Sequence, residues 1–154
     1  MRGRTRPGAA ARRSGYLIAA AITAVMWYVI NVWPGWRELS FLTADTAGVL
    51  WLVNLSFAVS IAVNLVYVVH DPPWFKALGD LVTTGIGLFV LVRLWRVFPF
   101  DFSGYSVDWA VPVRILLALA LFGSIVGILV QTVTLVRVAV GGGSSTGHRG
   151  EVTR

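Results

Sequence analysis

The sequence predicts an all-α integral membrane protein with four transmembrane helices in an antiparallel bundle, and three observations lead to it. The chain of 154 residues is 56% hydrophobic and 13% charged, and its mean hydropathy of +0.75 exceeds that of a usual soluble domain. The apolar residues fall into four segments, each near the roughly 20 residues that a helix needs to cross a bilayer core of about 30 Å. None of these segments shows strand-like alternation, and helices satisfy their own backbone groups inside lipid.

The four spans are predicted at about 16–33, 47–69, 75–98 and 111–140. A cleaved secretory signal is the alternative for the first segment, but its apolar run is longer than a typical signal core. The sequence NVWPGW that ends it also lacks the small-residue pattern of a cleavage site. Short connections predict that consecutive helices pack as antiparallel neighbours. Residues 1–15 are expected to form a disordered basic tail, and residues 141–154 a flexible tail rich in glycine and serine.

Charge around the first span predicts the orientation. Five arginines and no acidic residue precede that span: Arg2, Arg4, Arg6, Arg12 and Arg13. By the positive-inside rule this end faces the cytoplasm, and an even number of spans returns the C-terminus to the same side. We therefore expect a multi-pass protein of the cell membrane with both termini inside. The same arginines are expected to contact anionic lipids rather than nucleic acid, and the bias toward Ala, Gly, Val and Arg with a single Lys suggests a bacterial gene.

A second group of charges is predicted at the outer boundary, in and around the stretch RLWRVFPFDFSGYSVDW. Arg93 and Arg96 lie three residues apart at the end of the third span, and Arg37 and Arg114 reach the same level. Aromatic residues predict an interfacial belt here. We expect these arginines to pair with the carboxylates that collect in the outer loops, which are Glu38, Asp45, Asp101 and Asp108. An anion or lipid-headgroup site is the alternative, because clustered guanidinium groups bind phosphate in a bidentate manner.

Asp80 is the carboxylate predicted to lie deepest in the membrane. Only about 20 Å of helix separates it from Arg93, which is less than the thickness of the hydrocarbon core. Lys76, one turn earlier, predicts a neutralising ion pair at the inner boundary. At the start of the same span, Asp71 is expected to cap the helix, with Pro72 at its first position.

Small and polar residues recur at helical spacing and predict the faces on which the helices pack. The stripes are Ser56, Ser60, Asn64 and Tyr67 on the second span, Gly79, Thr83 and Gly87 on the third, and Gly123, Gly127, Gln131 and Thr134 on the fourth. Asn54 lies on another face of its helix and requires a separate partner. If a stripe lines a solute path instead, Asn64 and Gln131 are the residues expected to act in it.

Weak similarity between the two halves suggests a duplicated helical hairpin. Val32-Trp33-Pro34 recurs as Val97-Phe98-Pro99, and SIAVNLV recurs as SIVGILV, at offsets of 65 and 64 residues. Such a parallel duplication is known in transporters. The chain is similar to small multidrug exporters in size and number of spans. Their mechanism depends on a carboxylate within the first helix, and residues 16–33 contain none.

The composition leaves little material for catalysis. There are no cysteines, and the two histidines, His70 and His148, lie far apart in sequence and away from carboxylate clusters. We therefore expect no metal, no cofactor and no enzymatic activity. The leading hypothesis is a small membrane protein that works by association, as an accessory subunit, a scaffold or a homo-oligomer. A small transporter or channel for an ion or anionic solute is the alternative, with Asp80, Asn64, Gln131, Arg93 and Arg96 as its working residues, and a lipid-modifying enzyme ranks third.

Overall fold

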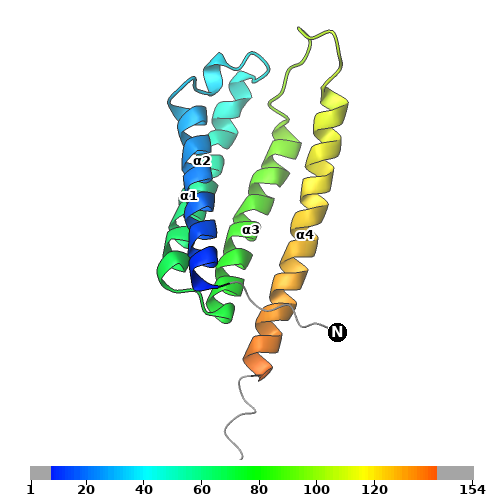
Figure 1. Cartoon of the computed structure of the whole chain (residues 1–154). Coiled ribbons are helices and arrows are strands. Elements are labelled where there is room, and N and C mark those ends of the chain that lie inside the picture. The colour runs from blue at the N-terminus through cyan, green and yellow to red at the C-terminus, as the bar shows by residue number, and fades with distance from the viewer. Residues whose placement is uncertain (1–7, 142–154) are drawn as a thin grey trace, which may run out of the picture.

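The structure, a computed structural model, describes residues 8–141 and is all-helical in this range apart from its loops. Four long helices run in alternating directions (Figure 1): α1 (Ala9–Asn31), α2 (Ala47–Val69), α3 (Pro73–Val97) and α4 (Ala110–Gly141). Each is long and apolar enough to cross a membrane. The prediction of an all-helical chain with four helices long and apolar enough to span a membrane is thereby confirmed, and consecutive long helices are antiparallel, as expected.

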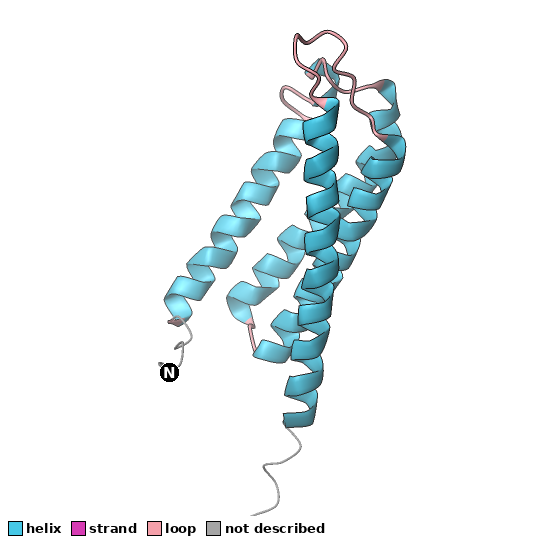
Figure 2. Ribbon diagram, turned by 90° about the vertical axis from the view of Figure 1, so that its right-hand side faces the viewer, coloured by secondary structure: helices cyan, strands magenta, loops and turns pink. Residues whose placement is uncertain are grey.

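The helices form an open row rather than a closed bundle. Over residues 8–141, α1 packs on α2, α2 on α3 and α3 on α4, and no other pair of long helices has more than marginal contact. The α1–α2 and α3–α4 hairpins are therefore joined mainly along α2 and α3. The α1–α2 and α3–α4 loops lie together at one end, which we call the loop end (Figure 2). The short α2–α3 turn, the start of α1 and the end of α4 lie at the other, which we call the terminal end.

Local sequence explains most helix boundaries. α3 begins at Pro73. Proline is tolerated in the first turn of a helix because the backbone N–H that it lacks would have no acceptor within the helix there. α1 ends three residues before Pro34, and α3 ends two residues before Pro99. α1 begins at Ala9, within residues 1–15 that were expected to form a disordered tail, because three consecutive alanines favour helix there. Of the two expected tails, 1–15 and 141–154, residues 1–7 and 142–154 lie outside the described residues.

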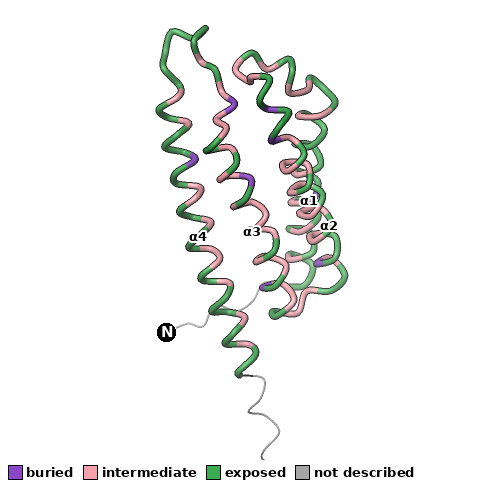
Figure 3. The backbone as a smooth tube through the Cα atoms, turned by 180° about the vertical axis from the view of Figure 1, so that it is seen from behind, coloured by how far each residue is buried: buried purple, intermediate pink, exposed green. Residues whose placement is uncertain are grey.

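Most of the helical surface is apolar and exposed, which suits contact with lipid rather than water. Large side chains in the middle of the helices, such as Phe89 at 71% and Phe122 at 68%, are largely uncovered by protein. Few residues are fully buried, and they lie between neighbouring helices (Figure 3). Hydrocarbon must cover the remainder, because a protein of this size in water would not expose so continuous an apolar surface.

The two loops at the loop end bind one another through their backbones. Leu42 and Phe100 form an antiparallel bridge. The Thr43 amide donates to the Pro99 carbonyl at 3.1 Å, and the Asp101 amide donates to the Phe41 carbonyl at 2.9 Å. Phe98 adopts a left-handed conformation with φ of 42°, which is costly for a residue with a side chain. That conformation places Pro99, which is almost fully buried, in the contact between the hairpins.

α3 approaches α2 closely at Gly79. A Cβ atom there would lie 2.2 Å from the Tyr67 hydroxyl oxygen and 2.9 Å from Cζ of the same ring. Tyr67, on α2, is only 3% exposed, so its ring has little room to move. Gly79 therefore makes the close helix contact that was predicted for the glycine stripes. Gly87 and Gly123 do not, because a Cβ at either position would have nothing within 4 Å among the described residues.

We expect Gly79→Ala to lower the free energy of unfolding in mild detergent by about 1–3 kcal/mol, because overpacking displaces the Tyr67 ring. Gly85→Ala on the same helix is the matched control, since its Cβ would have no neighbour within 4 Å. The control should be neutral, or more stable by up to about 1 kcal/mol from helix propensity. Equal effects of the two substitutions in a thermal or denaturant unfolding series would contradict the role assigned to Gly79.

Candidate functional site

A polar network at the terminal end connects all four helices. It starts on α1, where the Arg12 guanidinium binds the Asp71 carboxylate through Nε at 2.7 Å and Nη2 at 3.4 Å. The Tyr16 hydroxyl donates to the same carboxylate at 3.3 Å. Asp71 was predicted to cap α3, and this was wrong: α3 has no side-chain cap, and the carboxylate pairs with α1 instead. An ion pair with a cation from a neighbouring helix outweighs a cap, because a half-buried carboxylate needs a counter-charge.

The network continues on α2 and α3 around Tyr67. The Tyr16 and Tyr67 rings pack with their centroids 5.3 Å apart. The Tyr67 hydroxyl donates to the Lys76 carbonyl at 2.8 Å and to Asp80 Oδ1 at 3.1 Å. Lys76 Nζ forms an ion pair with Asp80 Oδ2 one turn away, which confirms the predicted pair. Asp80 therefore has both a counter-charge and a hydroxyl donor, and these make its position near the membrane interior tolerable.

The last link reaches α4. The Thr84 hydroxyl donates to the Asp80 carbonyl at 2.7 Å and accepts from Gln131 Nε2 at 3.1 Å. Gln131 Oε1 is buried and has no hydrogen-bond partner in the described part of the chain. A pocket of about 360 Å³ lies beside this link, between α3 and α4, lined by Pro73, Lys76, Ala77, Asp80, Gln131 and Thr134. The arrangement brings Asp80 and Gln131, both candidate residues from the sequence, to one pocket.

The other candidate on a predicted polar stripe, Asn64, lies elsewhere. Its amide donates to the Ser60 carbonyl of its own helix at 2.8 Å. Of the stripe on α2, only Tyr67 forms a hydrogen bond to another long helix within residues 8–141. A hydrogen bond from a side chain to a backbone carbonyl of the same helix satisfies the polar side chain in lipid without a partner helix.

Asn54 has the separate partner that its position required. Asn54 and Asn31, at the end of α1, exchange two amide hydrogen bonds of 2.8 Å each. Both side chains are half-buried between α1 and α2. Asn31 was not predicted as the partner of Asn54. The signal available in the sequence was an asparagine within an apolar segment, because such a polar side chain needs a hydrogen-bond partner in lipid.

The four arginines at the loop end do not form the expected ion-paired rim. Within residues 8–141 the salt bridges link Arg12 to Asp71 and Lys76 to Asp80, both at the terminal end. Arg93 and Arg96 are exposed on α3, and Arg114 is exposed on α4. The Arg114 guanidinium lies 4.6 Å from the centroid of the Phe98 ring, and the Arg37 guanidinium lies 5.0 Å from that of Trp36.

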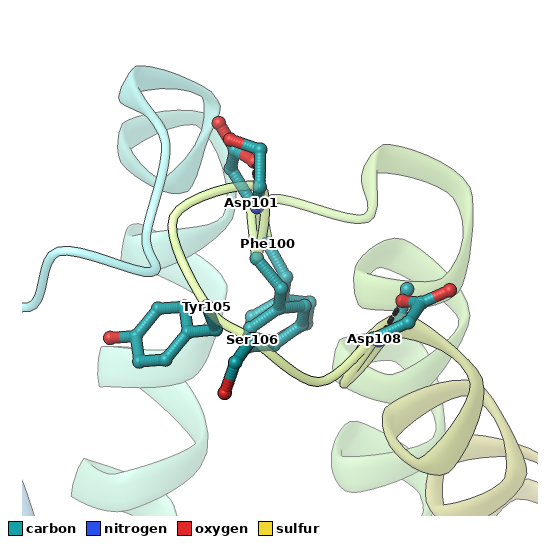
Figure 4. Close-up of a pocket in the computed structure, with 8 residues that line it drawn as sticks. Phe100, Asp101, Tyr105, Ser106 and Asp108 are labelled. Atoms are coloured by element: carbon teal, nitrogen blue, oxygen red, sulfur yellow. Dashed lines mark hydrogen bonds between the residues drawn. The ribbon is translucent and has the colours of Figure 1, made fainter.

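The carboxylates of the α3–α4 loop bind backbone amides instead. Asp101 accepts from the Ser103 amide at 2.9 Å, and Asp108 accepts from the Ala110 amide at the start of α4 at 3.0 Å. The Ser103 amide lowers the pKa of the Asp101 carboxyl from its ordinary value, because it stabilises the charged form. Both aspartates line an open pocket of about 510 Å³ (Figure 4), but they lie on different sides of it and do not converge.

A second pocket at the loop end lies beneath the bridged loops and is lined by apolar side chains. Its volume is about 270 Å³, and residues from both hairpins line it, among them Trp36, Leu42, Val49, Leu50, Pro99 and Phe100. Such a lining can hold an apolar group; it includes no acid or base, and its one hydroxyl is that of Thr46, which is buried without a hydrogen-bond partner among the described residues. The salt bridges within residues 8–141 are thus both at the terminal end.

Comparison with known proteins adds no relationship: no protein-family model, curated protein or solved structure matches this chain.

The asparagine pair predicts measurable coupling between α1 and α2. In a double-mutant cycle of Asn31→Ala and Asn54→Ala, we expect a coupling energy of about 0.6 kcal/mol, up to about 1.7 kcal/mol, which is the range for hydrogen bonds between membrane helices. Asn64→Ala combined with Asn31→Ala is the control and should show additivity, because Asn64 bonds within its own helix. Coupling of equal size in both cycles would show that the effect does not come from the paired amides.

The link between α3 and α4 predicts an asymmetry between its two partners. Thr84→Val should lower the free energy of unfolding by about 1–3 kcal/mol, because it leaves the Gln131 amide without its partner. Gln131→Leu should be close to neutral, since it removes an amide that is itself only partly satisfied. Both are measured by unfolding in the same detergent. A larger loss for Gln131→Leu than for Thr84→Val would contradict a packing role for the amide.

Proposed function

We propose that this chain is a small, non-enzymatic, multi-pass protein of the cell membrane that works by association, as an accessory subunit, a scaffold or a homo-oligomer. The observation that carries the proposal is the open row of helices. α1 and α4 each pack on a single long helix, so both ends of the row leave helix faces without a protein neighbour in the described chain. A row of this kind is completed by further helices more readily than a closed bundle is.

The use of polar groups supports the same proposal. Asn31 and Asn54 join α1 to α2, Tyr67 joins α2 to α3, and Gln131 joins α3 to α4. Each of these bonds holds neighbouring helices together. Few polar groups then remain to form a reaction centre, and this favours a structural role over catalysis.

Both termini are proposed to face the cytoplasm. The start of α1, which carries Arg12 and Arg13, the start of α3, which carries Lys76, and the end of α4, which carries Arg137, lie at the terminal end. The four acidic residues of the two long loops belong to the loop end. This distribution agrees with the positive-inside rule. Arg2, Arg4 and Arg6 would then contact anionic lipids of the inner leaflet, although these three residues lie outside the described range.

The association proposal is tested by extracting the protein from its native membrane in lipid-retaining nanodiscs and identifying what remains bound by mass spectrometry. We expect a stoichiometric protein partner or a defined homo-oligomer. Gly123→Leu should remove most of that partner, because Gly123 is exposed on α4 and a Cβ there would meet nothing within 4 Å, so the leucine would project onto the open face. Ala21→Leu, exposed on α1, is the comparison that tells which end of the row is used. A monomer that retains no protein in any lipid would contradict the proposal.

A small transporter for an ion or an anionic solute is the second candidate, and the α3–α4 pocket favours it. That pocket combines the Lys76–Asp80 ion pair with the unpartnered Gln131 oxygen. In proteoliposomes loaded with a pH-sensitive or chloride-sensitive dye, the wild-type protein should support a flux that Asp80→Asn abolishes. The unfolding midpoint of the variant is measured alongside to show that it remains folded. A flux that Asp80→Asn leaves unchanged would remove Asp80 from the mechanism.

A further inference from the structure

The α3–α4 pocket at the terminal end is built from one face of α3 and one turn of α4. Its lining residues on α3 lie at the three- and four-residue spacing of a single helical face: Pro73, Lys76, Ala77 and Asp80. Those on α4 are Gln131 and Thr134. The hydrogen bond from Gln131 Nε2 to Thr84 Oγ1 joins the two helices beside the pocket. Its volume of about 360 Å³ is in the range of roughly 300–1,000 Å³ that small-molecule sites have.

The charges in this lining cancel. Among the described residues that line the pocket, Lys76 and Asp80 are the charged ones, and they form an ion pair. The Tyr67 hydroxyl also donates to Asp80 Oδ1 at 3.1 Å. The two charged side chains are 37% and 33% exposed, so the pair is not sealed inside protein. A charged ligand that enters the pocket must therefore take the place of one member of this pair.

The two members of the pair differ in how easily they can be replaced. Lys76 is the fourth residue of α3, and Asp80 lies about 6 Å further from the terminal end of that helix. The long stem of Lys76 can carry its ammonium group to the water at this end, whereas the short side chain of Asp80 cannot reach it. A cation that replaces Lys76 leaves Asp80 with a counter-charge. An anion that binds Lys76 instead draws it away and leaves a carboxylate without one, which is the costly outcome.

Gln131 supplies an acceptor for the same kind of ligand. Its Nε2 is bound to Thr84, but its Oε1 is buried and has no hydrogen-bond partner in residues 8–141. The last torsion of a glutamine side chain is soft, so a small rotation can turn this oxygen toward a donor in the pocket. A ligand with N–H groups would satisfy it, whereas a quaternary ammonium ion has no N–H to donate.

We propose that the α3–α4 pocket binds a small organic ammonium ion that has N–H donors and an apolar substituent. The ammonium group takes the place of Lys76 at the Asp80 carboxylate and donates to Gln131 Oε1. The substituent packs against Pro73 and Ala77, which line the pocket with apolar surface. This inference does not rest on the association proposed above. It narrows the ligand of the second candidate function to a cation, and such binding does not require a flux.

The test is equilibrium dialysis of radiolabelled phenylethylammonium against the purified protein in nanodiscs, with empty nanodiscs subtracted. We expect saturable binding that Asp80→Asn weakens at least about tenfold, because a hydrogen bond to a charged group is lost. Gln131→Leu should weaken it about two- to tenfold, as expected for a neutral acceptor. Lys76→Gln should strengthen it about two- to fivefold, because the competing ammonium group is removed. A lysine with a merely structural role would not produce this gain.

Thr132→Val is the matched control, because Thr132 follows Gln131 on α4 but is exposed and donates to the Ile128 carbonyl of its own helix. It should change the affinity less than about twofold. Phenylacetate, which has a similar ring and the opposite charge, should not compete. Competition by phenylacetate, unchanged affinity in Asp80→Asn, or weaker binding in Lys76→Gln would each overturn the proposal. If Asp80→Asn does not fold, the Lys76 variant and the phenylacetate comparison carry the test. Saturable binding by a protein that shows no flux would support this site and contradict transport.

Discussion

The contact between Tyr67 and Gly79 is the constraint on which the rest of the structure depends. The two hairpins are joined mainly through α2 and α3, and these helices approach closely only because position 79 lacks a side chain. The approach brings the Tyr67 hydroxyl within reach of Asp80 and of the Lys76 carbonyl. One turn further along α3, the Thr84 hydroxyl donates to the Asp80 carbonyl and accepts from Gln131 on α4. Gly79 thus permits the α2–α3 contact next to which the polar link to α4 lies.

The two ends of the molecule use charge differently. At the terminal end, cations and carboxylates from separate elements meet, and tyrosine hydroxyls complete the hydrogen bonding of Asp71 and Asp80. At the loop end, the aspartates of the α3–α4 loop stabilise backbone turns, and the arginines project outward. The first arrangement is self-contained and holds helices together. The second leaves positive charge available to molecules outside the chain.

The sequence was sufficient for the parts of the structure that depend on local pattern. Apolar segment length predicted the four helices, and the i, i+4 spacing of Lys76 and Asp80 predicted their ion pair. The position of Asn54 on a separate face of its helix also predicted that it needs a hydrogen-bond partner other than the α2 stripe. Contacts between distant segments could not be predicted from the sequence. Asp71 pairs with Arg12 because α1 extends alongside the α2–α3 turn, and no spacing in the sequence shows that these two segments are neighbours. The backbone bridge between Leu42 and Phe100 is likewise independent of side-chain pattern. Of the carboxylates expected to pair with the outer arginines, Asp101 and Asp108 bind backbone amides instead.

The unequal lengths of the helices have a consequence for the surrounding bilayer. α4 has 32 residues and α3 has 25, or about 48 Å and about 38 Å at a rise of about 1.5 Å per residue. In Figure 1 the end of α4 extends past the terminal end of the other helices, and the last two turns of α4 carry the exposed apolar side chains of Val136 and Val140 beside the exposed Arg137. Lipid on the α4 side must therefore stretch, or the whole row must tilt, to keep these residues from water. Stretching would make the membrane thicker beside α4 than beside α1, and elastic relaxation of that difference would act on any neighbour that approaches from the α4 side.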